Sequence, residues 1–328
     1  MGMPFLLAPM AELSHRPLRE LIHSFGGCDE YYTEMISAPA LLSGGEFESY
    51  YIDGLPDPGK TVYQLVGANP EQLAAAAAAL SGKECAGIDI NMGCAAPAIT
   101  RTGAGAAWMN SADAAARMIE GVRKATDRRL SVKLRIGPSD DYEYLLGFCR
   151  ALESAGVERI TLHPRTVKEK FRRRARWEYV ARLGNDLSVP VAGNGDIADA
   201  ADLAEKAGGP WAAVMAGRGA VRFPWIFARA RMLEGGESRK QNFLGDSIDL
   251  AETAARFLDL LVRYQPREFH LSRARRFFAY FCDNLTWAHY VKTLIGREPD
   301  ISGIAAVLAG YFRDHPEERY ISLNSGPS

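Results

Sequence analysis

The sequence predicts an α/β protein: a TIM (β/α)8 barrel followed by a small all-helical domain. Eight short apolar runs recur over roughly the first 220 residues, each followed by a turn and an amphipathic or alanine-rich segment, which is typical of this barrel. After Gly219 the apolar residues recur at three-and-four spacing, which is typical of helices. The alternative, a doubly wound open sheet, favours a GxGxxG turn after its first strand, and the stretch "LAPMAELSHRP" contains no glycine.

The expected strands are short runs bounded by turn residues, and helices lie between them. One helix begins with Asn69 as its N-cap and Pro70 at its first position, and another ends at Gly156. The expected helices cover 69–80, 111–126, 142–156 and 198–208. The expected strands cover 4–10, 30–36, 61–67, 87–93, 130–137, 159–165, 189–196 and 212–219.

The change of pattern near residue 235 predicts two domains. Residues 1–235 form the expected catalytic barrel, and residues 236–328 form the helical domain with a short disordered tail, "NSGPS". Segments 247–265 and 270–296 carry the helical spacing without strand alternation.

Composition and charge indicate a cytoplasmic globular protein. The 328 residues carry a formal net charge of -1 and are 47% hydrophobic and 24% charged. We expect no export signal and no membrane span, because the N-terminus lacks a basic region before a long apolar run and no stretch approaches ~18 apolar residues. The five cysteines form no CxxC pair and none stands at ligand spacing from a histidine, which favours a reducing compartment and no metal site.

Polar residues and glycines gather at the ends of the expected strands, where barrels carry their active sites. The turns "GNGDI" and "AGRGA" follow the seventh and eighth strands, a common place for phosphate binding by backbone N–H groups, so we expect a ligand with a monophosphate. The candidates at the strand ends are Pro9, Met10, Gln64, Asn91, Cys94, Lys133, Arg135, His163, Arg165, Asn194, Gly195, Asp196, Gly217 and Arg218.

Lys133 alternates with apolar residues in "SVKLRIG", so its side chain is expected to point into the barrel. An isolated ammonium is costly to bury, and it needs an anionic or electron-rich partner. A flavin, whose reduced form carries negative charge near N1, would supply that partner. The alternative interpretation is a lysine that reaches solvent at the surface.

Seven stretches, "LAPM", "YQLVG", "DINMGC", "VKLRIG", "LHPRT", "AGNGDI" and "MAGRGAVRFPWIF", resemble in order and spacing the dihydrouridine synthase family. The resemblance covers about residues 5–230, and the helical segment resembles that family's small RNA-binding domain. It implies a TIM barrel that holds FMN. NADPH would reduce the FMN, which would then reduce the C5–C6 double bond of a uridine in RNA.

The resemblance also implies roles for the candidates. Asn91 would hydrogen-bond the extruded uracil, Gln64 and Lys133 would contact the flavin ring, and Arg165 would reach the substrate or its loop. FMN contacts are implied for Pro9, Met10, Gln64, Lys133, His163, Asn194, Gly195, Asp196, Gly217 and Arg218, with the glycine turns at the phosphate.

Cys94 is the expected general acid. Hydride delivery to C6 of uracil builds enolate character toward C5, and the reaction finishes only when an acid protonates C5. A thiol at the end of the fourth strand is such an acid, and it stays protonated at neutral pH unless a cation lowers its pKa. We expect the other four cysteines to be inert core residues.

Two stretches bear on the RNA substrate. The family usually continues the cysteine with proline and a lysine-containing stretch, whereas this chain reads "GCAAPAITRTGAG", which should loosen the loop and weaken its phosphate contacts. The stretch "RTVKEKFRRRARW" at 165–177 restores positive charge, and we expect Arg172, Arg173 and Arg174 to contact the RNA backbone.

Three functions remain open from sequence. The favoured one is an NADPH-dependent, FMN-containing enzyme acting on RNA, with tRNA preferred over rRNA, as a monomer without membrane contact. The second is an FMN-dependent small-molecule reductase of the dihydroorotate dehydrogenase or old yellow enzyme kind. The third is an RNA- or flavin-binding homologue whose catalytic loop has lost its use.

Overall fold

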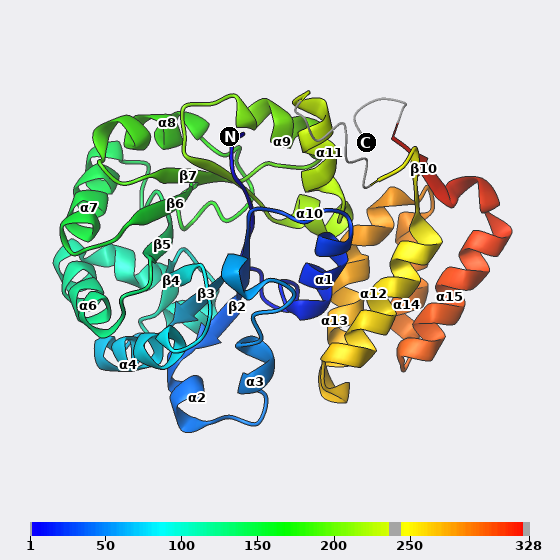
Figure 1. Cartoon of the computed structure of the whole chain (residues 1–328), viewed down its shortest axis with the longest axis horizontal. Coiled ribbons are helices and arrows are strands. Elements are labelled where there is room, and N and C mark those ends of the chain that lie inside the picture. Colours follow the sequence, from blue (N-terminus) through cyan, green and yellow to red (C-terminus); the bar gives the residue numbers. More distant parts are fainter. Residues whose placement is uncertain (1, 236–243, 324–328) are drawn as a thin grey trace.

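The computed structural model describes residues 2–235 and 244–323, and the first of these parts forms a closed barrel (Figure 1). Neighbouring strands are parallel and follow chain order, and β8 pairs with β1. All eight expected strands are present, so the expected TIM barrel is confirmed. The strands are β1 Phe5–Leu7, β2 Glu30–Ser37, β3 Thr61–Val66, β4 Gly87–Met92, β5 Leu130–Arg135, β6 Arg159–His163, β7 Val191–Asn194 and β8 Ala213–Ala216.

Helices surround the barrel, and the four that the sequence predicted agree with the structure to within two residues at each end. The Asn69 side chain accepts a hydrogen bond from the Gln72 N–H (2.8 Å), and Gly156 takes a left-handed φ of +102° just after α7. The helices of this part are α1 Arg16–Ser24, α2 Ala38–Ser43, α3 Glu48–Tyr51, α4 Pro70–Ser81, α5 Pro97–Thr100, α6 Ala112–Ala125, α7 Tyr142–Ser154, α8 Trp177–Asp186, α9 Ala200–Ala207, α10 Arg218–Arg222 and α11 Ile226–Leu233.

The inside of the barrel is closed at the N-terminal ends of the strands. Glu30 at the start of β2 reaches across to two arginines, Arg129 (2.6 Å) before β5 and Arg159 at the start of β6, and Arg159 also donates to the Tyr32 hydroxyl (2.7 Å). Apolar side chains, including Leu6 and Met215, pack next to them. A ligand therefore enters the barrel only from the C-terminal ends of the strands, here called the barrel mouth.

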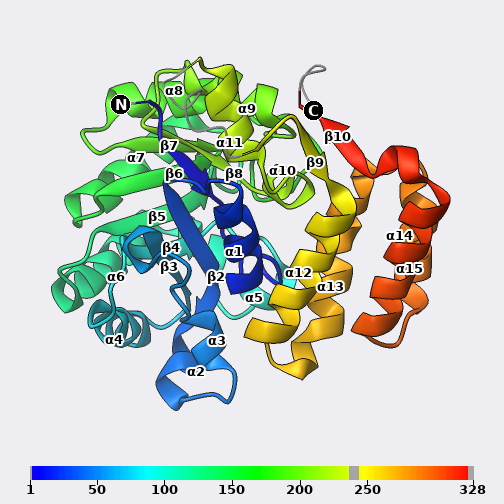
Figure 2. The ribbon, with the colours of Figure 1, turned by 45° about the vertical axis from the view of Figure 1, so that its right-hand side comes forward.

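Four further helices stand beside the barrel, where α12 packs on α1 and α13 on α10 (Figure 2). Their bounds are α12 Leu250–Tyr264, α13 Arg267–Phe281, α14 Ala288–Arg297 and α15 Ile301–Asp314. The all-helical expectation needs one correction, because β9 Ser247–Asp249 and β10 Tyr320–Ser322 form an antiparallel pair. Such a pair joins segments far apart in the chain, so local helical spacing does not predict it.

A buried ion pair joins the C-terminal helices to the barrel. Arg273 of α13 lies 3.0 Å from Glu34 of β2, and their side chains are 3% and 4% exposed. Glu34 also accepts the Glu12 N–H (2.6 Å), and burial raises the pKa of its carboxyl. One hydrophobic cluster continues from α1 and α11 into α12 and α13. The C-terminal helices therefore share a core with the barrel.

The expected domain boundary lies at the edge of residues 236–243, which are outside the described residues, as is the expected disordered tail at 324–328. Among the helices that the structure describes, none is long and apolar enough to cross a membrane.

Candidate active site

A chain of hydrogen bonds links side chains of β3, β4 and β5 inside the barrel. Gln64 Nε2 donates to Asp89 Oδ2 (2.7 Å), and Asn91 Nδ2 donates to Gln64 Oε1 (2.9 Å). Ser131 Oγ donates to the other oxygen of Asp89 (2.6 Å), and burial raises the pKa of that carboxyl. The chain fixes the orientation of both amides. Asp89, which the sequence did not single out, is the common acceptor, and its place two residues before Asn91 on the same strand is the signal that could have found it.

Asn91 also holds the loop that carries Cys94. Its Oδ1 accepts the N–H groups of Cys94 (2.9 Å) and Gly93 (3.2 Å). On the other side, the Cys94 carbonyl accepts the Ala106 N–H (3.0 Å). Gly105 has a φ of +61°, and a Cβ there would lie 2.7 Å from the Cys94 oxygen. The loop without the family's usual proline is therefore held by the Asn91 side chain at its start and by a backbone hydrogen bond from Ala106 at its end.

Cys94 differs from the other cysteines in its exposure. All five lie in the described residues, and Cys94 alone is half-buried. Burial raises the pKa of the remaining four thiols, to about 12 for Cys282 and further for Cys28 and Cys149. Four thiols are thus sealed in the core, and the fifth stands at the barrel mouth.

Lys133 lies beside Asn91 in the register of β4 and β5. Burial lowers the pKa of its ammonium to about 8, and the charge of Arg135 lowers it further, while Asp89 and Cys94 oppose the shift. In the part of the chain that the structure describes, the ammonium makes no hydrogen bond or salt bridge. The barrel thus holds a cation that lacks a protein partner.

Arg135 connects two loops of the barrel mouth. Its Nε donates to the Gly93 carbonyl (2.9 Å), and its Nη1 donates to the carbonyls of Thr166 (3.2 Å) and Lys170 (3.0 Å). Burial and the neighbouring Arg165 lower the pKa of the guanidinium to about 10. Sequence reasoning gave this residue no role, although its position two residues after Lys133 places it on the inner face.

His163, Arg165 and Asp196 form a second cluster across the mouth. Arg165 donates to His163 Nε2 (3.0 Å), to Asp196 Oδ1 (2.5 Å) and to the Arg173 carbonyl. Burial and the charge of Lys133 hold the pKa of His163 far below its usual range, so the imidazole is neutral. The Arg165 side chain is 4% exposed, and its N–H groups donate to other protein groups. These bonds fix the loop that follows β6.

The glycine turns after β7 and β8 lie side by side. Asn194 Nδ2 donates to the Met215 carbonyl (2.8 Å), which links the two strand ends. Gly195 has a φ of +123°, and a Cβ there would lie 2.9 Å from the His163 ring, so this position requires glycine.

The end of β1 meets the second of these turns. A Cβ on Gly217 would lie 3.5 Å from Met10 Sδ, and Pro9 and Met10 form the half-buried segment that follows β1. Arg218 is exposed and forms no ion pair within residues 2–235 and 244–323, and its guanidinium lies 4.4 Å from the centre of the Phe171 ring. The structure thus brings the expected flavin-binding residues to one opening.

The arginine loop, residues 166–176, lies at the rim of the mouth rather than inside it. Arg176 pairs with Glu169 (2.5 Å) and Asp140 (3.2 Å). Arg172, Arg173 and Arg174 are exposed and form no ion pair with any described residue. Arg173 and Arg174 line an open groove of ≈ 670 Å³ beside residues 138–140.

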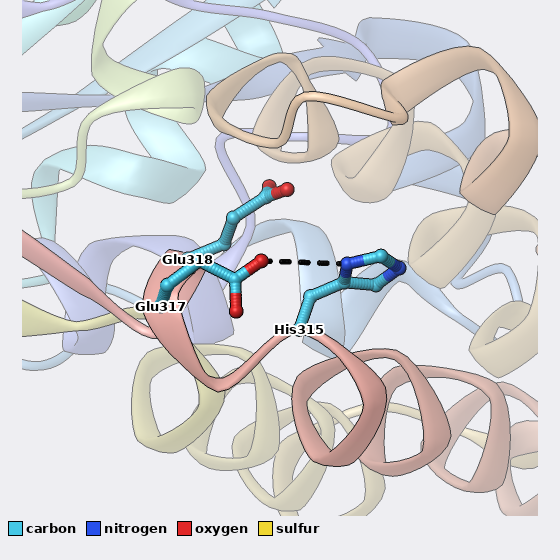
Figure 3. Close-up of side chains that lie close together, drawn as sticks. All are labelled: His315, Glu317 and Glu318. Atoms are coloured by element: carbon cyan, nitrogen blue, oxygen red, sulfur yellow. Dashed lines mark ion pairs between the residues drawn. The ribbon is translucent and has the colours of Figure 1, made fainter.

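One group of possible metal ligands occurs in the described residues, and it lies in the C-terminal part. His315, Glu317 and Glu318 place ligand atoms within 4.8 Å of one another (Figure 3). Glu318 already accepts from the Tyr311 hydroxyl (2.8 Å) and the Thr286 N–H (2.8 Å). Both bonds go to Oε2, so this carboxylate joins the segment after α15 to the preceding helices.

Comparison with known proteins agrees with this geometry. The family model described as "Dihydrouridine synthase (Dus)" matches residues 6–296. A "Probable tRNA-dihydrouridine synthase" of Rhodobacter capsulatus is 31% identical over 85% of this chain and 86% of its own length. The "tRNA-dihydrouridine(16) synthase" of Cupriavidus necator is 33% identical over 72% of this chain and 76% of its own. With a match of this extent, and with a barrel mouth that brings the resembling stretches to one opening, the chain belongs to the dihydrouridine synthase family of oxidoreductases.

Proposed function

We propose that the protein uses FMN and NADPH to reduce the C5–C6 double bond of a uridine in tRNA. The observation that carries the proposal is the juxtaposition at one opening of a half-buried thiol, Cys94, and a cation, Lys133, that has no hydrogen-bond or ion-pair partner among the described residues. The relatives named above as tRNA-dihydrouridine synthases support the substrate class.

The residues at the mouth fit a flavin mononucleotide. The Lys133 ammonium, which no described residue pairs with, suits the pyrimidine edge of the ring, where negative charge develops on reduction. Gln64 presents an amide whose orientation Asp89 fixes. The turn at Gly195 and the exposed Arg218 suit the phosphate, because glycine lets the backbone approach and the guanidinium carries no competing ion pair among the described residues. When bound, FMN supplies the hydride.

Asn91 and Cys94 are placed to act on the uracil. Asn91 donates one amide hydrogen to Gln64, and its oxygen accepts from the Cys94 loop. Its second amide hydrogen is left to donate to a uracil carbonyl. Cys94 then transfers the proton on Sγ to C5, and the thiolate is reprotonated from solvent, to which this half-buried side chain has access. NADPH takes the place of the uracil in the earlier half of the cycle.

The uridine must leave its RNA stack to reach this site. Because Glu30 and its two arginines close the far end of the barrel, the base enters through the mouth. We assign Arg172, Arg173 and Arg174 at the rim to the phosphate backbone, and the C-terminal helices to the body of the tRNA.

The first test is mass spectrometry of dihydrouridine in tRNA and rRNA from cells with and without the gene. Loss at one or a few tRNA uridines supports the proposal and identifies the target. Unchanged dihydrouridine in every RNA, from a protein that still binds FMN, contradicts it. A purified protein that is colourless and takes up no FMN on reconstitution contradicts the cofactor assignment.

A further inference from the structure

An exposed aromatic side chain stands at the barrel mouth without a role in the reaction described above. Phe171 is 58% exposed. Its ring centre lies 5.9 Å from that of His163, and the guanidinium carbons of Arg218 and Arg135 lie 4.4 and 5.6 Å away. The ring therefore lies at the rim, beside the ends of β5 and β6 and the start of α10.

The loop that carries Phe171 is fixed at both ends and charged between them. Arg165 and Asp196 hold its far end through the Arg173 carbonyl and the Ala175 N–H (2.6 Å), and Arg135 holds the Lys170 carbonyl. On either side of Phe171 the cations Lys168, Lys170 and the arginines 172–174 are exposed, and none of them pairs with a described residue.

A rigid aromatic ring among unpaired cations is the arrangement that proteins use for single-stranded nucleic acid, since each base offers a π-face and each nucleotide a phosphate. We propose, building on the proposed function, that Phe171 stacks on a base that flanks the extruded uridine. The groove lined by Lys168, Arg173 and Arg174 takes the phosphates next to that base.

The position of the ring decides between a flanking base and the reacting one. The uracil must reach Asn91 in β4 and Cys94 just after it, whereas Phe171 lies beside His163 at the end of β6, Arg218 at the start of α10 and, further away, Arg135 at the end of β5. The two residues nearest to the ring, Arg218 and His163, thus belong to other strand ends than the one that carries the thiol, which places a base on Phe171 beside the reacting uracil rather than in its place. Stacking there holds the strand while the uridine enters the barrel, which contributes to RNA affinity and not to the chemistry at C5.

The test compares Phe171→Ala, Phe171→Leu and Phe171→Trp with wild type, by FMN content, NADPH oxidation, and kcat/KM and affinity for tRNA. We expect the Ala and Leu variants to lose on the order of 5- to 150-fold in kcat/KM for tRNA, and the Trp variant to stay near wild type. FMN content and NADPH oxidation should not change. Since no charge is removed, the slope of log affinity against log salt should also stay the same.

Leu233→Ala is the matched control, because Leu233 is an exposed apolar residue of α11, which packs near Phe5 at the opposite end of the barrel. If the wild-type protein forms dihydrouridine and Phe171→Ala has the same kcat/KM for tRNA, the stacking role is overturned and the proposed function stands. Loss of FMN in Phe171→Ala also overturns the stacking role, because the ring would then serve the cofactor. Absence of dihydrouridine from the wild-type protein refutes the proposed function instead.

Discussion

The charge of Lys133 makes flavin binding depend on pH in a window that the structure defines. With a pKa of about 8, the ammonium of the flavin-free protein is about 90% protonated at pH 7 and about 10% at pH 9. Only the protonated form attracts the electron-rich edge of the ring. The affinity for FMN should therefore fall about tenfold between pH 7 and pH 9, and this loss corresponds to ~1.4 kcal/mol.

FMN affinity falls, rather than rises, with pH because the pKa of Lys133 is shifted downward. Burial places the pKa of Lys133 below its ordinary value, so raising the pH through about 8 removes a charge that an exposed lysine would keep. FMN affinity is measured by quenching of flavin fluorescence at several pH values. Lys133→Arg keeps its charge throughout and should show a flat profile, and Lys133→Met should bind weakly at every pH. Identical pH profiles for wild type and Lys133→Arg would refute the reasoning.

Three further predictions address the chemistry, the RNA and the fold. Cys94→Ala should retain FMN and NADPH oxidation yet lose on the order of 10²–10⁴-fold in dihydrouridine formation, measured by single-turnover assays; full turnover would exclude the thiol as the acid. Reversing the charge of the arginines at 172–174 should weaken tRNA binding and flatten its salt dependence in filter binding, whereas an unchanged slope would return them to a solvated loop. Glu30→Gln should reduce the free energy of unfolding by about 3 kcal/mol in urea titrations, because Arg129 and Arg159 lose their shared carboxylate. These arginines hold the pKa of Glu30 below its usual range, so its contribution is present above pH ~4.5 and is lost as the pH falls through the lower folded-state value; a pH-independent difference from Glu30→Gln would contradict this assignment.

Local patterns determined the elements of this fold because each depends on neighbours in the chain. The alternation in "SVKLRIG" placed Lys133 inside the barrel, and Asn69 with Pro70 marked the start of α4. The positions of Asn91, Cys94 and Lys133 at or near the ends of expected strands predicted that they lie on one face of the barrel. The segment at 247–249 was misassigned because its strand exists only through pairing with residues 320–322.

The contacts that shape the site were outside the reach of sequence patterns. The ion pair between Glu34 and Arg273 connects residues 239 positions apart in the chain (273 − 34). Hydrophobic periodicity is a local pattern, so it does not predict a contact between residues so far apart. The role of Arg165 was also decided in three dimensions. It was expected to reach the substrate or its loop, and its guanidinium faces His163, Asp196 and the loop backbone.

The sequence by itself determined the barrel and predicted which polar side chains lie at the ends of its strands, because alternation and helical period are properties of adjacent residues. Only the tertiary structure decided which groups remain free. It paired Asp89 with Gln64, buried four of five cysteines, and left Lys133 without a hydrogen-bonding or salt-bridge partner among the described residues. A side chain's availability depends on what the rest of the chain places within hydrogen-bonding distance, and that is fixed only when the barrel closes.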